Sequence, residues 1–267
     1  MICAFIPRRT RRPALRPAIA LLLATLAVPV AAVGPNNALN DTGITTYGDA
    51  TSNNLTSEPA DYPGQDARVG RDAAALAGKL PKVGAGSKGF DFTKISNSGA
   101  VLPASAVLGT AVSDWGCTYD NVTGLMWEVK VNDATHLRHQ AWGYTWYDSN
   151  AATNGGNVGI TSGGNCKTVG RCDTEKFVQD VNAAGMCGHG DWRVPTIKEL
   201  ESIADYGRVI PAIDSSWFPN TPLMYFSSAS ADASNSLNAW SVSFIQGNAY
   251  SYLKSYGNQI RLVRVGQ

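Results

Sequence analysis

Four cysteines in the middle of the chain constrain its fold more than any other feature. Cys117, Cys166, Cys172 and Cys187 follow an N-terminal stretch that has the features of an export signal, and Cys3 lies within that stretch. An even number of cysteines in an exported chain is typical of a disulfide framework. A zinc site is disfavoured because no C-x-x-C spacing occurs. We therefore expect two disulfides.

The spacing of the cysteines excludes one of the three pairings. Cys172 and Cys187 flank a predicted helix of about eleven residues, whose ends lie roughly 16 Å apart. A disulfide requires Cα atoms within about 7 Å of one another. Two pairings remain: Cys117–Cys187 with Cys166–Cys172, which we prefer, and Cys117–Cys172 with Cys166–Cys187.

Residues 1–32 are predicted to be a signal peptide. Five arginines and no acidic residue precede an apolar run from Ala18 to Val33: Arg8, Arg9, Arg11, Arg12 and Arg16. The run ends in Val30-Ala31-Ala32, small residues typical of a cleavage site. It is broken by Pro29 and is shorter than the roughly 20 residues that span a bilayer. We expect an exported protein, periplasmic, surface-bound or secreted, with no membrane span after cleavage.

Cleavage changes the charge of the chain. It removes five of the 22 basic residues and none of the 21 acidic ones, which leaves a net charge of about −4. This charge disfavours nucleic acid and anionic membranes as partners.

The rest of the chain divides into two parts. Residues 33–86 are polar and without a sustained period, which predicts a loosely ordered extension or a few short strands laid on the main domain. A short helix is predicted over Asp72–Leu80. Residues 87–267 carry the organised patterns. Cys117–Lys130 predicts two strands around Asp120-Asn121, and a long loop follows from Asn132 to Gly170.

Two helices and several strands complete the predicted domain. The first helix starts at Asp173 or Thr174 and stops at Gly185. The second has a capping box formed by Thr196 and Glu199 and ends at Gly207. Four further strands are predicted over Met224–Ser228, Ala239–Ile245, Ala249–Lys254 and Gln259–Val265. The fold class is therefore α+β.

The order of several short motifs resembles a known family. These motifs are Asp120-Asn121-Val122-Thr123-Gly124-Leu125-Met126-Trp127-Glu128, Asp191-Trp192-Arg193-Val194-Pro195-Thr196, Lys198-Glu199-Leu200, Ser227-Ser228, Ala239-Trp240 and Arg261-Leu262-Val263-Arg264. Together they resemble the family typified by the C-terminal domain of the Legionella collagen-like adhesin (the Lcl C-terminal domain) from about Trp115 to Gln267.

The resemblance implies a C-type-lectin-like domain with two helices and a mixed, mainly antiparallel sheet, and a binding role at a cell surface. The named adhesin attaches to glycosaminoglycans. The present chain lacks a collagen-like repeat and is net acidic, whereas sulfated glycans require a basic cluster. We therefore carry over the fold and a general binding role, without the sulfated ligand.

A tyrosine row is the predicted ligand site. Tyr250, Tyr252, Lys254 and Tyr256 alternate, so all four would point to one side of a strand. Tyrosine among Ser and Asn residues is typical of adaptable recognition surfaces. The alternative is a half-buried strand with its aromatic side chains in the core. Lys254 within the row favours an exposed face.

Other conspicuous residues favour structural roles. Trp127, Trp192 and Trp240 are expected in the core. Arg193 and Arg264 are expected to pair with Asp191 or Glu199.

No metal, cofactor or catalytic site is expected. His136 and His139 lie three apart without an accompanying Glu or Cys. Phe218-Pro219-Asn220 lacks the acidic residue of a calcium-binding lectin triplet.

The resulting hypothesis is an exported, non-enzymatic recognition or adhesion protein that binds a glycan or a surface protein. Three alternatives remain. The first is a structural or accessory subunit of a surface appendage, and the second is a diversified lectin-like receptor with a variable C-terminal face. The third is an enzyme resembling formylglycine-generating enzymes, which would require reactive cysteines and a metal. The sequence leaves open whether the chain forms a homo-oligomer.

Overall fold

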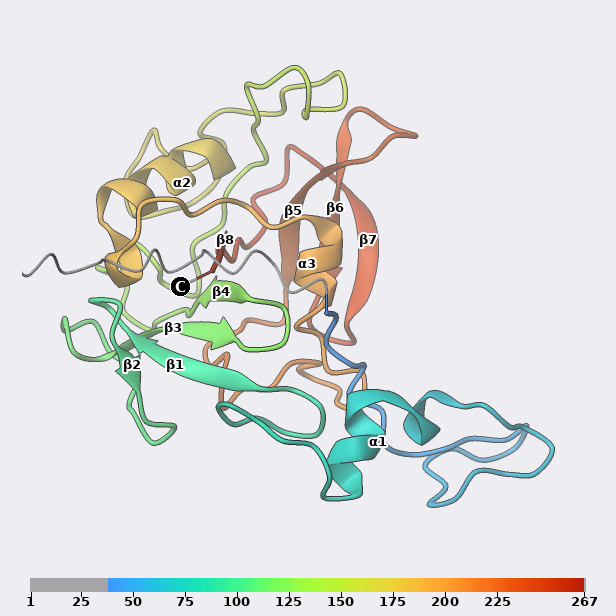
Figure 1. The fold of residues 1–267 in the computed structure, drawn as a ribbon. Helices are drawn as coiled ribbons and strands as arrows, with labels where there is room; N and C mark the ends of the chain where they lie inside the picture. Colours follow the sequence, from blue (N-terminus) through green and yellow to red (C-terminus); the bar gives the residue numbers. More distant parts are fainter. Residues whose placement is uncertain (1–37, 267) are drawn as a thin grey trace, which may run out of the picture. The chain divides into compact units, whose positions relative to one another are not determined.

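A computed structural model describes residues 38–266 of the chain, and the predicted signal peptide lies outside the described residues. The α-helices and 3-10 turns are η1 (Asp66–Arg68), α1 (Gly70–Leu76), α2 (Thr174–Ala183), η2 (Met186–Gly188) and α3 (Ile197–Glu201). The strands are β1 (Phe92–Ser96), β2 (Val101–Leu102), β3 (Trp115–Asp120), β4 (Leu125–Glu128), β5 (Tyr225–Ala231), β6 (Asn238–Ser243), β7 (Asn248–Leu253) and β8 (Val263–Val265). This composition confirms the α+β class (Figure 1).

The first sheet has five strands in the order β2-β1-β3-β4-β8, and all its pairs are antiparallel. The β3–β4 hairpin turns where the sequence predicts it. The Asp120 carboxylate accepts the N–H of Val122 at 2.9 Å and the hydroxyl of Thr123 at 2.8 Å, and Gly124 has a φ of 74°. Trp127 of β4 is fully buried beneath this sheet.

The second sheet has three strands in the order β5-β6-β7, again all antiparallel. The expectation of one mixed sheet was therefore wrong. Strands β5 to β7 follow one another through hairpins and pair locally, whereas β8 returns to β4, where Val263 faces Trp127. Parallel pairing among the described residues is limited to isolated bridges such as Phe226 with Gln259.

Helix α2 begins and ends as the sequence predicts. The Asp173 carboxylate accepts the N–H of Lys176 at 2.9 Å, and Gly185 follows the helix with a φ of 63°. Phe177 and Val181 form its buried face. No helix in residues 38–266 is long and apolar enough to span a membrane.

Helix α3 has the predicted capping box but is shorter than expected. Both hydrogen bonds between Thr196 and Glu199 are present. The helix ends at Glu201 rather than near Gly207, because the chain turns away where the N–H of Asp205 bonds to the carbonyl of Ala212.

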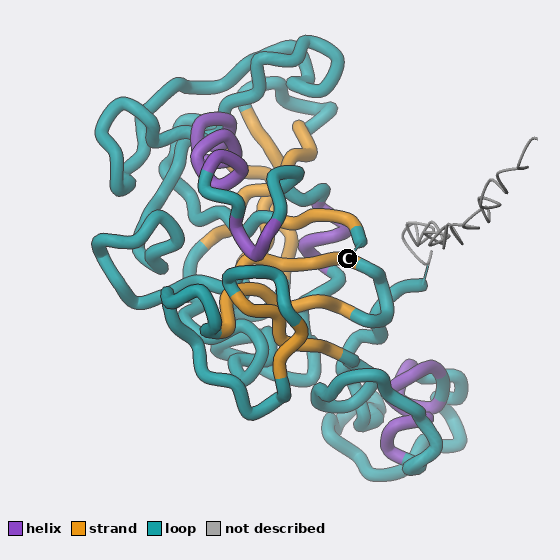
Figure 2. The backbone as a smooth tube through the Cα atoms, turned by 60° about the vertical axis from the view of Figure 1, so that its left-hand side comes forward, coloured by secondary structure: helices purple, strands orange, loops and turns teal. Residues whose placement is uncertain are grey.

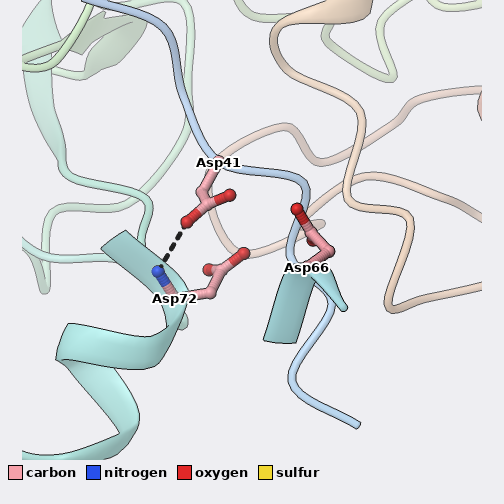
Figure 3. A group of neighbouring side chains, drawn as sticks. All are labelled: Asp41, Asp66 and Asp72. Atoms are coloured by element: carbon pink, nitrogen blue, oxygen red, sulfur yellow. Dashed lines mark hydrogen bonds between the residues drawn. The ribbon is translucent and has the colours of Figure 1, made fainter. Parts of the chain in front are cut away.

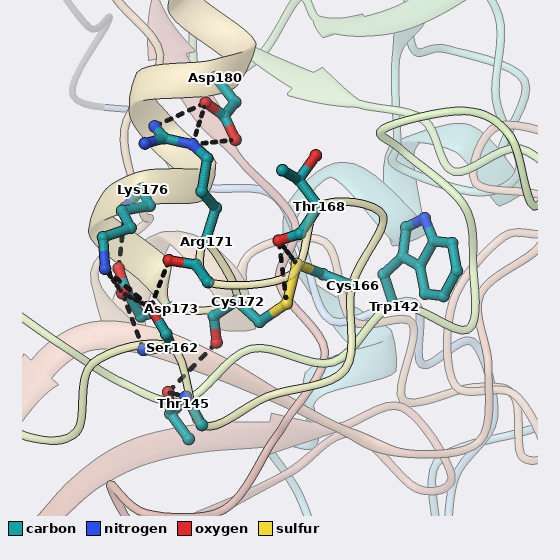
Figure 4. The surroundings of a disulfide bond; sticks show 12 residues. Trp142, Thr145, Ser162, Cys166, Thr168, Arg171, Cys172, Asp173, Lys176 and Asp180 are labelled. Atoms are coloured by element: carbon teal, nitrogen blue, oxygen red, sulfur yellow. Dashed lines mark hydrogen bonds and ion pairs between the residues drawn. A yellow bond between two sulfur atoms is a disulfide. The ribbon is translucent and has the colours of Figure 1, made fainter.

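The preferred disulfide pairing is confirmed. Cys117 and Cys187 are joined with a Cα–Cα distance of 6.4 Å, and Cys166 and Cys172 with one of 5.3 Å. The first bond is fully buried and ties β3 to η2. The second closes a short loop next to α2, as Figure 4 shows.

The polar segment before residue 87 is bonded to the rest of the described chain. Its helix α1 starts two residues before the predicted Asp72 and ends four before Leu80. The amide of Asn40 donates to the Asp120 carboxylate at 2.5 Å and to the Ser202 carbonyl at 3.0 Å. The Asp72 carboxylate accepts the N–H of Gly89 at 2.6 Å. The domain boundary at residue 86 remains a prediction.

Candidate functional site

Tyrosines line one face of the β5-β6-β7 sheet. Tyr225 of β5 pairs with Ser243 of β6, and Tyr250 of β7 pairs with Ser241, so these side chains share a face. Phe226 and Val242 point to the opposite face and are fully buried in the core. The β6 residues on the tyrosine side are small and buried: Ala239, Ser241 and Ser243. Because they are small, the tyrosine rings reach one another across β6.

Four rings form a connected aromatic cluster, which we call the tyrosine face: Tyr225, Tyr250, Tyr252 and Tyr256. Tyr225 stacks on Tyr252 at 4.5 Å between ring centroids and meets Tyr250 edge-on at 5.4 Å. The ring centroid of Tyr256 lies 5.1 Å from that of Tyr252. Tyr250 is 40% exposed and Tyr256 52% exposed, so the cluster is open to solvent. Mutual packing holds the rings before any ligand arrives.

Tyr225 is the member that the sequence analysis did not assign to the site. It lies on β5, two strands away from Tyr250 and Tyr252. Tyr225 begins a segment rich in Ser, Asn and Tyr, residues 225–258, and this composition was the only signal in the sequence. Alternation along one strand cannot reveal a neighbour from another strand.

The prediction that Lys254 lies on the exposed face was wrong. Its side chain is 2% exposed, and its ammonium donates to the carbonyls of Asn154 at 2.8 Å and Asn157 at 2.7 Å. The ammonium also lies 4.2 Å from the Trp146 ring centroid. Strand β7 ends at Leu253, so the alternation that unites the tyrosines does not extend to Lys254.

Lys254 instead binds the long loop that separates β4 from α2. No helix or strand lies between Glu128 and Thr174, and Figure 2 draws such stretches in teal. The backbone N–H of Trp146 bonds to the Lys254 carbonyl at 2.9 Å, which adds a second attachment. Burial lowers the pKa of the Lys254 ammonium, which no carboxylate contacts within 4.0 Å in residues 38–266.

A groove of about 780 Å³ is lined in part by residues of this loop, from Trp146 to Gly155. Trp146, Val178 of α2, Val194 and Ala231 of β5 contribute to its apolar lining. Apart from the Tyr147 hydroxyl, its polar side chains hydrogen-bond within the protein. Glu175, for example, accepts the N–H of Ser149 at 2.9 Å. No polar group in the groove identifies a ligand.

Two charged residues of the family-like motifs, Glu128 and Arg261, are fully buried and hold β4 to the end of the chain. Glu128 and Lys130 form a fully buried ion pair at 2.7 Å. The second Glu128 oxygen accepts the N–H of Leu262 at 2.9 Å, and Arg261 donates to the Glu128 carbonyl at 2.7 Å. Burial lowers the pKa of Arg261 to about 10. These residues are structural.

The remaining motif residues also have structural roles. Trp127 and Trp192 are buried, as expected, whereas Trp240 is only half-buried. Arg193 forms a bidentate ion pair with Glu199, in which its two terminal nitrogens donate to the two carboxylate oxygens at 2.7 and 2.5 Å. Arg264 pairs with Asp191 at 2.7 Å. Both arginine predictions are confirmed.

Three carboxylates gather in the N-terminal segment: Asp41, Asp66 and Asp72 (Figure 3). Their oxygens lie within 4.8 Å of one another. Asp41 accepts the N–H of Asp72 at 2.8 Å, and Asp72 accepts the N–H of Gly43 at 2.6 Å. Asp66 accepts the hydroxyl of Thr42. Burial, with the nearby Asp41 charge, raises the pKa of Asp72. Each of the three carboxylates thus accepts a hydrogen bond from a group of the protein itself.

The cysteines of the described chain are all oxidised. Cys117, Cys166, Cys172 and Cys187 form the two disulfides, so residues 38–266 offer no free thiol for formylglycine-type chemistry.

Comparison with known proteins places the chain in a family. The model of the Lcl C-terminal domain matches residues 116–264, which is more than half of the chain and contains β4, α2, α3 and the tyrosine face. Neither a curated protein nor a solved structure matches. The family model covers more than half of the chain, and all the short motifs of the sequence lie within the matched range. This chain therefore belongs to the Lcl C-terminal domain family.

Proposed function

We propose that this protein is an exported recognition protein of the adhesin type and that the tyrosine face binds its ligand, a glycan or a surface protein. The observation that carries the proposal is the solvent-open cluster of four packed rings, of which Tyr250 and Tyr256 are 40% and 52% exposed. Membership of the Lcl C-terminal domain family supports an extracellular binding role.

The chemistry of the tyrosine face suits recognition. A tyrosine ring offers a flat apolar surface with a hydroxyl at its edge, and few rotatable bonds are immobilised when it binds. The Tyr250 hydroxyl lies 3.3 Å from the Asn248 amide, which places a polar pair at the rim. Sugars present apolar C–H faces and hydroxyl edges, and this combination matches such a surface.

The fold supports the rigidity of this surface. The rings pack on small buried residues of β6, and the buried Lys254 fixes the chain directly after β7. A preorganised site loses less conformational entropy on binding. The two disulfides, which are stable in an oxidising compartment, agree with an exported protein.

Glycan-array binding by the chain without residues 1–32 tests the proposal. The double variant Tyr250→Ala and Tyr252→Ala should lose the signal. The matched control is Tyr62→Ala, because Tyr62 is 45% exposed but lies outside the tyrosine face. Binding that survives the double variant would refute the tyrosine face as the site. A blank array from folded, fully oxidised protein would refute a glycan ligand of the classes arrayed and leave a surface protein as the proposed partner.

A further inference from the structure

A pocket lies beside strand β1, where two other segments of the chain border this strand. Ala85 pairs with Phe92 at the start of β1, and Leu102 of β2 pairs with Lys94 further along. Both segments and β1 line the pocket, which has a volume of about 410 Å³. This volume falls within the range of small-molecule sites, roughly 300–1,000 Å³.

The register of the sheet brings Lys94 and two aromatic side chains to the same side. Lys94 pairs with Thr118 across β1 and β3, so their side chains share a face. The Thr118 hydroxyl donates to the Trp217 carbonyl at 2.8 Å, which holds Trp217 against that face. Phe92 precedes Lys94 by two residues and takes the same side, with its ring centroid 5.8 Å from that of Trp217. Lys94 thus lines the pocket together with two buried aromatic rings.

The Lys94 ammonium is a buried cation without a carboxylate partner. Lys94 is 8% exposed, and no Asp or Glu oxygen in residues 38–266 lies within 4.0 Å of its ammonium. The ammonium donates to the Ala106 carbonyl at 2.8 Å and lies 3.9 Å from the Trp115 ring centroid. It is also 5.6 Å from the ring centroid of Trp217, a wall of the pocket. Burial lowers the pKa of this ammonium.

The other buried lysine beside a tryptophan, Lys254, is better satisfied by the protein. Its ammonium contacts the Trp146 ring and donates to two carbonyls, whereas Lys94 has one ring in close contact and one carbonyl. An ammonium has three donors, so Lys94 retains one that no acceptor of the described chain takes. Buried lysines are normally paired with an anion. The unused donor and the adjoining pocket together indicate a ligand that carries that anion.

We propose that this pocket binds a small carboxylic acid with an apolar body, whose carboxylate pairs with the Lys94 ammonium. The carboxylate supplies the acceptor that the chain itself does not. Lys94 is the only charged side chain among the residues that line the pocket, which matches the single negative charge of a carboxylate. A neutral ligand of the same shape leaves the buried charge without its partner.

The rest of the lining favours a hydrocarbon body for this ligand. Phe92 and Trp217 form buried aromatic walls. Asn121 also lines the pocket, but both protons of its amide are donated within the protein, to Asp91 at 2.9 Å and to Thr93 at 3.0 Å. Lys94 is thus the lining side chain with a donor to spare, and the other atoms of the ligand bury apolar surface.

Titration of the oxidised chain without residues 1–32, followed by the NMR spectrum of the ¹⁵N-labelled protein, tests the proposal. The probe is phenylacetate, and the matched control ligand is phenylacetamide, which has the same shape and no charge. Phenylacetate should bind saturably. Phenylacetamide should bind at least about tenfold more weakly, because it cannot form the charge-assisted hydrogen bond to Lys94.

Two variants test the assignment to this pocket. Lys94→Met keeps the length of the side chain and removes its charge, and should lower the affinity for phenylacetate at least about tenfold. Ala104→Phe leaves Lys94 intact and should weaken binding by filling the pocket from its exposed rim. Lys79→Met is the matched control, because it removes an equal charge from an exposed position outside the lining. Near-ultraviolet circular dichroism confirms that each variant is folded, and Ala104→Phe decides if Lys94→Met does not fold.

Three results would overturn the proposal. They are an absence of saturable phenylacetate binding by the folded wild type, equal binding of phenylacetamide, and an unchanged affinity in the folded pocket variants. Glycan binding by the tyrosine face is independent of all three, because the pocket and the tyrosine face share no residue.

Discussion

Removing the two disulfides one at a time should destabilise the protein unequally. The bond Cys117–Cys187 closes a loop with a sequence separation of 70, and Cys166–Cys172 one of 6. The chain-entropy relation gives a stabilisation of about 4 kcal/mol for the first loop and about 2 kcal/mol for the second. Burial widens the difference, because Cys117 and Cys187 are both fully buried and alanine would leave a cavity in their place.

The assay is equilibrium unfolding in urea of oxidised protein with either pair changed to alanine. Each variant serves as the control of the other, because both lose two sulfur atoms and one covalent bond. We expect the Cys117→Ala, Cys187→Ala protein to lose at least about 2 kcal/mol more free energy of unfolding than the Cys166→Ala, Cys172→Ala protein. Equal losses, or a larger loss for the short loop, would refute the loop-length argument.

Two further predictions concern buried cations and pH. Lys254→Met leaves the carbonyls of Asn154 and Asn157 without their donor, and should cost about 2 kcal/mol and speed hydrogen exchange in residues 150–158. Because Lys254 also fixes the chain directly after β7, ligand binding should weaken without being lost. Unchanged hydrogen exchange together with complete loss of binding would show that Lys254 belongs to the ligand site. Burial, aided by the nearby Arg138 charge, lowers the pKa of His136 below its ordinary 6.5. The unfolded chain therefore takes up a proton at this histidine more readily than the folded protein does. The stability that neutral His136 contributes is present above pH 6.5 and is lost as the pH falls through and below that value. The melting temperature of His136→Gln should therefore fall less than that of the wild type between pH 7.5 and pH 5, and identical slopes would contradict this assignment.

The sequence predicted those features that depend on near neighbours. The capping box of Thr196 and Glu199, the start of α2 at Asp173 or Thr174 and the turn after Asp120 were all predicted correctly, because each involves residues within a few positions of one another. The length of the helix between Cys172 and Cys187 excluded one disulfide pairing by geometry alone. The family motifs located the domain, and the match over residues 116–264 confirms the family.

Only the tertiary structure decided how distant segments meet. It selected the disulfide pairing, divided the strands into two sheets and placed Tyr225 beside Tyr250 and Tyr252. It also removed Lys254 from the predicted site. The alternation of side chains predicts which face of the sheet a residue occupies within a strand, but it does not predict the residue at which the strand ends. The buried Lys254 ammonium donates a hydrogen bond to the carbonyl of Asn154, which lies 100 residues earlier in the chain. Contacts across such separations depend on the packing of the whole domain, and no local pattern in the sequence records them.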